Sequence, residues 1–95
     1  MIVWQYRADY RGWLAFDTNV RDYGSYEVEI NGVMCSCVAH IRPCMGGVEG
    51  YYNSGKTGRP TESHKDKHIP HDKWPEGVDT IEQKKAYLAM LYELQ

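Results

Sequence analysis

Residues 50–57 carry a phosphate-binding pattern. They read Gly-Tyr-Tyr-Asn-Ser-Gly-Lys-Thr, which matches the loop G-x-x-x-x-G-K-[ST] at every position. A loop of this kind works between a buried strand and a helix whose N-terminus holds the phosphates. Here Gly58-Arg59-Pro60 follows directly, and no helical pattern appears in the next twenty residues. We interpret the match as chance and expect a turn that exposes Lys56 and Arg59.

Four potential zinc ligands lie within ten residues, in the order Cys35, Cys37, His40 and Cys44. Structural zinc sites usually take two sulfurs from a C-x-x-C turn, which a C-x-C pair on a strand does not provide. The odd number of cysteines, in a chain whose first residues show no signal-peptide pattern, favours reduced thiols. We expect core thiols, with Cys35 and Cys37 on one strand face and His40 on the other.

A histidine-rich segment offers a second set of metal ligands. His64, His68 and His71 would align on a helix, but Pro70 and the polar flanking residues disfavour that helix. A solvated loop is therefore the expected structure. The three histidines are weak candidates for zinc, and the leading prediction includes no cofactor.

Most aromatic residues of this chain are of the types that carry a polar group, with eight Tyr and three Trp against one Phe. Tyr and Trp combine a large apolar face with a polar edge, so they serve contact surfaces as well as cores. Two adjacent tyrosines stand near two cations, a combination that suits a protein hot spot or a phosphate. The residues concerned are Tyr51, Tyr52, Lys56 and Arg59. Alternatively, Tyr51 and Tyr52 complete the core.

The length and composition of the chain limit the kind of fold that can position these side chains. The chain has 95 residues and a formal net charge of −2, which fits one globular domain over residues 1–95. The basic excess of residues 42–73 is small, so we expect no duplex nucleic acid partner. The longest apolar runs are far below the ~20 residues that cross a bilayer, so we expect no membrane partner and a cytoplasmic location.

Residues 1–41 are expected to form β hairpins. The best local signal is Asn31-Gly32, a preferred type I′ turn that would place Ile30 opposite Val33 and Val28 opposite Cys35. Residues 42–79 contain many Gly, Pro and His residues and predict a long loop, a wrap or a ragged hairpin, with one possible short strand at 48–52. A long irregular segment is a natural place for function.

The C-terminal residues 80–95 are expected to form a helix. Thr80, with a glutamine three residues later, matches a capping box. Leu88 and Tyr92 share an apolar stripe and Lys85 lies away from it. The predicted fold class is therefore α+β, with a small antiparallel sheet of about four or five strands and one C-terminal helix packed on it.

Short motifs in the first sixty residues resemble, in order, the WWE domain. They are Trp4-Gln5-Tyr6, Gly12-Trp13 with Phe16-Asp17, the stretch 27–32, and Asn53 with Thr57-Gly58-Arg59. That family is a half-barrel of strands with a helix, and many members bind the iso-ADP-ribose unit of poly(ADP-ribose). The resemblance implies a sheet that presents Tyr6 to an adenine ring and Arg59 to phosphates.

The leading functional prediction is a small non-enzymatic binding protein with an accessory or inhibitory role, of the kind that viruses use against a host. It would block a protein partner through Tyr51, Tyr52, Lys56 and Arg59. One alternative is a WWE-like binder or sponge of an ADP-ribose-type or other nucleotide, held by Tyr6, Trp13 and Arg59. Another alternative is a zinc-stabilised interaction module.

Overall fold

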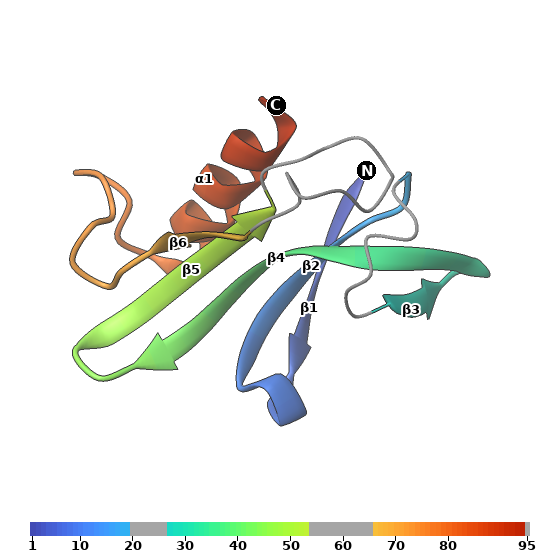
Figure 1. The fold of residues 1–95 in the computed structure, drawn as a ribbon, viewed down its shortest axis with the longest axis horizontal. Helices are drawn as coiled ribbons and strands as arrows, with labels where there is room; N and C mark the ends of the chain where they lie inside the picture. Colours follow the sequence, from blue (N-terminus) through green and yellow to red (C-terminus); the bar gives the residue numbers. More distant parts are fainter. Residues whose placement is uncertain (20–26, 54–65, 95) are drawn as a thin grey trace.

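The computed structural model describes residues 1–19, 27–53 and 66–94, and shows a twisted antiparallel sheet with one long helix on one face (Figure 1). The elements are β1 (Ile2–Arg7), a 3-10 turn η1 (Ala8–Tyr10), β2 (Gly12–Asp17), β3 (Glu27–Ile30), β4 (Val33–Cys44), β5 (Gly47–Asn53), β6 (Asp66–Ile69) and α1 (Ile81–Glu93). The strand order is β1-β2-β4-β5-β6, and β3 pairs with the first part of β4. The predicted α+β class is confirmed, with six strands among the described residues.

The β3–β4 hairpin has the predicted register. Asn31 and Gly32 both take positive φ, 53° and 82°, as a type I′ turn requires. Ile30 pairs with Val33, and Val28 pairs with Cys35. The register that the turn predicts is therefore the one that the hairpin has.

The segment 42–79 contains more regular structure than its composition predicts. β4 continues to Cys44, and the possible short strand at 48–52 is part of the longer β5. β6 was not predicted, because its four residues, Asp-Lys-His-Ile, show no apolar alternation. These residues form a strand because their backbone hydrogen-bonds to β5, not because their own sequence pattern predicts one.

A β-bulge in β4 changes which residues share a face. Ala15 pairs with Ala39, but the next residue, Phe16, pairs with Cys37, so β4 has one extra residue, Val38. Val38 and Ala39 consequently both join the core beneath the helix. The expectation that His40 and Cys37 lie on opposite faces of the strand is wrong. The extra residue shifts the alternation of side chains along β4 by one position, so His40 and Cys37 share a face. Leu14, which pairs with His40, accordingly packs in the same cluster as Cys37.

α1 begins at the predicted cap and covers the sheet with its apolar stripe. The Thr80 hydroxyl accepts a hydrogen bond from the Gln83 backbone N–H, and the Gln83 side chain accepts one from the Thr80 N–H, so the capping box is complete. Leu88 and Tyr92 are fully buried against Ile41 and its neighbours. No helix of the described ranges is long and apolar enough to cross a membrane.

Lys85 departs from the prediction. It lies in the buried part of α1 and is only 8% exposed, because its ammonium nitrogen sits 3.3 Å from the centroid of the Trp13 ring. Its Nζ also donates to Glu82 at 3.2 Å. The aliphatic part of the lysine therefore packs like an apolar side chain, while the charge rests on an aromatic face and a carboxylate.

Candidate functional site

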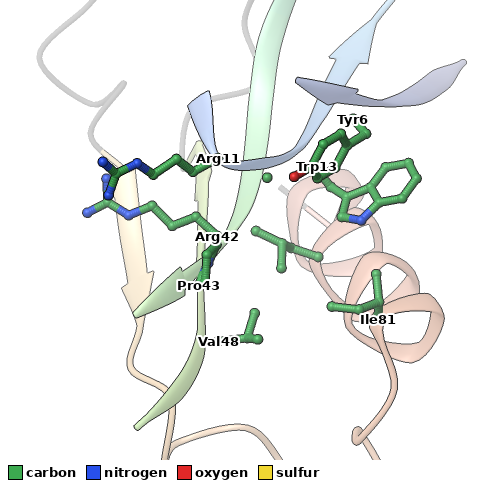
Figure 2. A pocket seen from close by; sticks show the side chains of 9 residues that line it. Tyr6, Arg11, Trp13, Arg42, Pro43, Val48 and Ile81 are labelled. Atoms are coloured by element: carbon green, nitrogen blue, oxygen red, sulfur yellow. The ribbon is translucent and has the colours of Figure 1, made fainter. Parts of the chain in front are cut away.

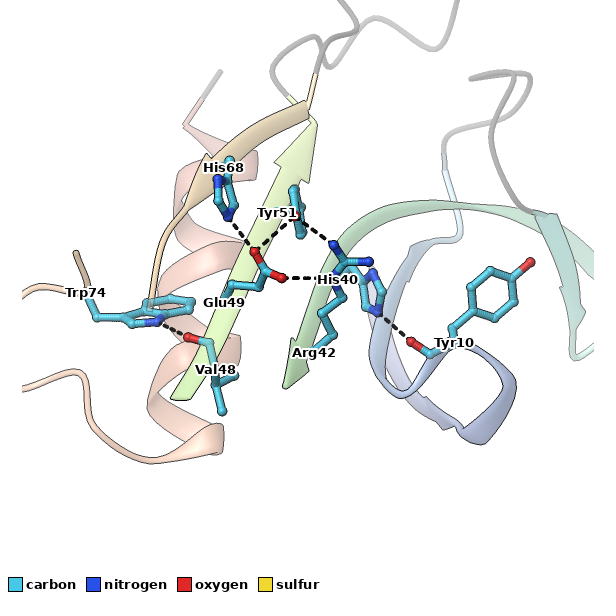
Figure 3. Close-up of polar contacts among 8 residues, drawn as sticks. All are labelled: Tyr10, His40, Arg42, Val48, Glu49, Tyr51, His68 and Trp74. Carbon is cyan, nitrogen blue, oxygen red and sulfur yellow. Dashed lines mark hydrogen bonds and ion pairs between the residues drawn. The ribbon is translucent and has the colours of Figure 1, made fainter. Parts of the chain in front are cut away.

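Alternate residues of three adjacent strands project from the sheet face opposite α1 (Figure 3). His40 and Arg42 belong to β4, Glu49 and Tyr51 to β5, and His68 to β6. Register brings them together, because Tyr51 pairs with both His40 and His68, and Arg42 pairs with Glu49. We call these five residues the open-face cluster.

The carboxylate of Glu49 lies at the centre of the open-face cluster. Arg42 Nε donates to Oε2 at 3.0 Å, while the Tyr51 hydroxyl at 3.0 Å and His68 Nε2 at 2.6 Å both contact Oε1. Arg42 Nη2 also donates to the Tyr51 hydroxyl at 3.1 Å. The Glu49 side chain is 13% exposed, whereas Arg42 and His68 are 46% and 45% exposed. One shielded acid thus holds two exposed nitrogen-bearing side chains in place.

These contacts keep Glu49 ionised and Arg42 charged. Partial desolvation raises the pKa of Glu49, but hydrogen bonds from His68, Arg42 and Tyr51 outweigh it, and the net pKa lies below its ordinary value. The hydrogen bond to Glu49 is the main reason that the pKa of Arg42 is raised. The charge state of the pair is therefore fixed through the neutral pH range.

The ring of Tyr51 is held from several sides. It stacks on the His68 ring with centroids 4.6 Å apart and an interplanar angle of 17°. The Arg42 guanidinium carbon lies 5.2 Å from the Tyr51 centroid, and the His40 ring lies 6.4 Å away at a tilt. His40 Nε2 in turn contacts the backbone oxygen of Tyr10 at 3.2 Å. The open-face cluster is consequently a preorganised surface of aromatic rings and nitrogen donors.

The outer atoms of the open-face cluster suit recognition of an anion. Arg42 Nη1 makes no hydrogen bond to any described residue, so it can donate outward. Arg7 of β1 lies on the same face of the sheet as the open-face cluster and adds another cation, whose guanidinium donates a hydrogen bond to Gln5. Carboxylate and phosphate oxygens are the groups that guanidinium donors bind most strongly.

A hollow of about 240 Å³ lies on the other face of the sheet, beside α1 (Figure 2). Tyr6 and Trp13 form one side of it, and their rings meet edge to face with centroids 5.5 Å apart. Pro43 stands opposite, with Val48 and Ile81 at one end. Tyr6 is 59% exposed, so an aromatic surface is open to solvent here.

The remaining residues lining the hollow are Arg11, Gly12, Ile41 and Arg42. The two arginine side chains run side by side past Pro43 and point away from the rings (Figure 2). The hollow is therefore apolar between its aromatic and aliphatic walls, and the Arg42 guanidinium lies with Glu49 on the opposite face of the sheet.

The structure separates the two predicted tyrosines. Tyr51 joins the open-face cluster, whereas Tyr52 points to the other face and packs against the core under α1. Successive residues of a strand face opposite ways, so they cannot form one contact patch. Tyr6 and Trp13 are brought together in the hollow, as their pairing in β1 and β2 requires. Lys56, Arg59 and His64 lie outside the described residues.

The predicted histidines do not form a metal centre with other described residues. His68 contacts Glu49, while the His71 ring lies on the β4–β5 turn, where a Cβ added to Gly46 would be 2.7 Å from its Nε2. In the described ranges, no group of three or more His, Cys, Asp or Glu side chains is placed to hold a metal ion.

Sequence reasoning missed Arg42 and Glu49 as site residues and considered His40 only as a zinc ligand. A hairpin whose turn lies at residues 45–46 pairs Arg42 with Glu49 and His40 with Tyr51. The register of this hairpin, rather than a sequence motif, is the feature that could have identified these residues. The glycine-rich composition of the segment obscured that hairpin, because glycine weakens a strand pattern.

Comparison with known proteins finds no matching family model, curated protein or solved structure for this chain. The resemblance to the WWE domain stays a prediction, and the class of protein rests on the α+β fold and on the two surfaces described above.

Proposed function

We propose that this is a non-enzymatic binding protein whose open-face cluster contacts an acidic region of a protein partner. The observation that carries the proposal is the Glu49 network, in which one shielded carboxylate fixes the half-exposed side chains of Arg42 and His68. Blocking such a partner in an accessory or inhibitory role, as the sequence predicts, is part of the proposal.

The side chains of the open-face cluster are already held in place before a partner binds, which supports the proposal. Arg and Tyr are enriched among the residues that dominate binding energy at protein interfaces. Ordering a side chain on binding costs about 0.5–1.5 kcal/mol, and Arg42 and Tyr51 are already ordered by Glu49 and His68. Binding would therefore lose less conformational entropy here than at a surface of unsupported side chains.

Charge is the second support, and it indicates an acidic partner. Arg42 is permanently charged and Arg7 lies on the same face, while His40 and His68 add positive charge when protonated. Glu49 offsets one of these charges, but its side chain is mostly shielded by the groups around it. Carboxylates of a partner would meet the outward donors of Arg42.

Chemical-shift mapping tests the proposal. The probes are a Glu-rich peptide and its Lys-rich counterpart, titrated into isotope-labelled protein. We expect the Glu-rich peptide to shift the amide signals of residues 40–42, 49–51 and 68, and Arg42→Gln to weaken its binding about tenfold. Lys73→Gln, a matched loss of one exposed cation, should bind like the wild type. Equal shifts with both peptides, or shifts confined to other residues, would contradict the proposal.

A further inference from the structure

The turn η1 lies against the open-face cluster. His40 Nε2 contacts the backbone oxygen of Tyr10, the last residue of η1, at 3.2 Å (Figure 3). Gly12 follows two residues later, where a Cβ would overlap the backbone of β4 and lie 3.0 Å from Arg42 Cα. Glycine therefore allows β2 to begin in close contact with β4. Arg11, between these two contacts, is placed next to Arg42.

Arg11 and Arg42 form a pair of cations beside Pro43. Their side chains run next to each other and point away from the aromatic wall of the hollow (Figure 2). The Arg42 guanidinium lies with Glu49 on the open face of the sheet, and Arg11 extends in the same direction. The pair therefore enlarges the open-face cluster and takes no part in the aromatic wall.

Arg11 is the uncompensated member of this pair. Glu49 balances the charge of Arg42, whereas Arg11 is exposed and no described residue makes a hydrogen bond or ion pair with its guanidinium. Its φ is 57°, in the left-handed region, where glycine or asparagine fits with less strain. No contact of the guanidinium stabilises the fold, so an arginine in this backbone conformation indicates a binding role.

Two adjacent guanidinium groups favour an anion with more charge and more oxygens than a carboxylate has. Glu49 and the Tyr51 hydroxyl occupy Nε and Nη2 of Arg42, so Arg42 offers only its outer edge, while the donors of Arg11 are available. One guanidinium is enough to bind both oxygens of a carboxylate. A phosphate monoester carries a charge of about −1.5 to −2 and three acceptor oxygens, so it can bridge both arginines.

We infer that Arg11 and Arg42 bind a phosphate group carried on a serine or threonine side chain of the protein partner. The inference rests on the proposed function and names the acidic group that the partner presents there. Sites for free small molecules are usually concave and bury most of the ligand. Here Arg11 is exposed and the Arg42 side chain is 46% exposed, on an open sheet face, which suits a group held by a larger partner.

Fluorescence anisotropy of labelled peptides tests the inference. The peptides share one Glu-rich sequence and differ at a single central position, which is phosphoserine, glutamate or serine. We expect the phosphoserine peptide to bind at least about tenfold more tightly than the glutamate peptide. Equal affinities for these two peptides would overturn the inference and leave the proposed function intact. If no peptide bound, both the inference and the proposed function would be wrong.

Competition with inorganic phosphate distinguishes a phosphate on the partner from free phosphate. We expect inorganic phosphate to displace the phosphoserine peptide only at concentrations at least about a hundredfold above the dissociation constant of the peptide. Displacement at concentrations close to that constant would show that the pair binds free phosphate, which contradicts recognition of a partner.

Arg11→Gly is the decisive variant, because glycine suits a φ of 57° and the fold should be retained. We expect its melting temperature to equal or exceed that of the wild type. Its affinity for the phosphoserine peptide should fall about tenfold, and its affinity for the glutamate peptide should change less than about threefold. Arg42→Gln should instead weaken both peptides, since the proposed function already uses Arg42.

The matched control is Lys73→Gln, which removes one exposed cation elsewhere and should leave both affinities unchanged. An Arg11→Gly protein that keeps its fold and binds the phosphoserine peptide like the wild type would contradict the assignment. A loss of the same size in Lys73→Gln would also contradict it, because net charge rather than the arginine pair would then explain the binding.

Discussion

The hydroxyl of Tyr92 donates a 2.8 Å hydrogen bond to Oδ2 of Asp17, in the interior of the protein and across 75 positions of the sequence. Tyr92 is completely buried and Asp17 is 3% exposed. The backbone N–H of Asn19 donates to the other carboxylate oxygen of Asp17 at 2.9 Å, and the N-terminal ammonium lies 3.7 Å from that same oxygen. The end of α1 is thereby joined to the end of β2 by a charged hydrogen bond.

Tyr92→Phe should destabilise the protein by about 1–3 kcal/mol, because it leaves a buried carboxylate oxygen without its donor while keeping the ring. Urea unfolding followed by circular dichroism measures the change. The matched control is Tyr87→Phe, on the same helix, where the half-buried ring meets Trp74 and the hydroxyl has no hydrogen bond to a described residue. Equal unfolding free energies for the two variants would contradict the role of the Tyr92 hydroxyl.

Glu49 should make stability depend on pH in the acid range. Its folded-state pKa lies below the ordinary value of 4.5, so the ionised carboxylate stabilises the fold fully above that value. This contribution is lost as pH falls through the folded-state pKa. We therefore expect wild-type protein to exceed Glu49→Gln in unfolding free energy at neutral pH, and the difference to shrink on acidification.

Unfolding curves of both proteins from neutral pH to below pH 4.5 measure this dependence. Glu76→Gln, which removes an exposed carboxylate outside the open-face cluster, should track the wild type throughout. A difference between wild type and Glu49→Gln that stays constant or grows as pH falls would refute the electrostatic account of the cluster.

The capping box should contribute measurably to α1. Thr80→Ala removes the acceptor for the Gln83 N–H and should cost about 1 kcal/mol in unfolding free energy. Thr80→Ser keeps a hydroxyl at the same place and should restore most of that loss. If serine and alanine proved equally destabilising, packing of the threonine methyl rather than capping would be the cause.

Gly50 should tolerate no side chain. A Cβ at this position would lie 2.6 Å from Trp74 Cη2 and 3.2 Å from Leu88 Cδ1, so Gly50→Ala must displace the indole or the helix. We expect a loss of about 1–3 kcal/mol and a change in tryptophan emission. At Gly32, by contrast, a Cβ meets nothing within 4 Å, and asparagine tolerates its φ of 82°, so Gly32→Asn is the control and should cost less. A similar loss in both proteins would argue against steric exclusion.

Local signals explain which features were predictable. The Asn31-Gly32 turn fixes a register among its immediate neighbours, and Thr80 caps a helix through a hydrogen bond three residues away. In both cases the interacting groups are close in sequence, so the local pattern of residue types is enough to predict the structure. The assignment of Lys85 to the exposed side failed because the aromatic face that receives it belongs to β2.

The sequence by itself determined the α+β class, the hairpin and the capped helix. The tertiary structure decided the rest: the bulge at Val38, the strand β6, and the meeting of Arg42, Glu49 and His68. The physical reason is that strand pairing and side-chain networks depend on contacts between segments distant in the chain. No local preference specifies which partners these segments meet, so the two surfaces emerge only when the sheet is assembled.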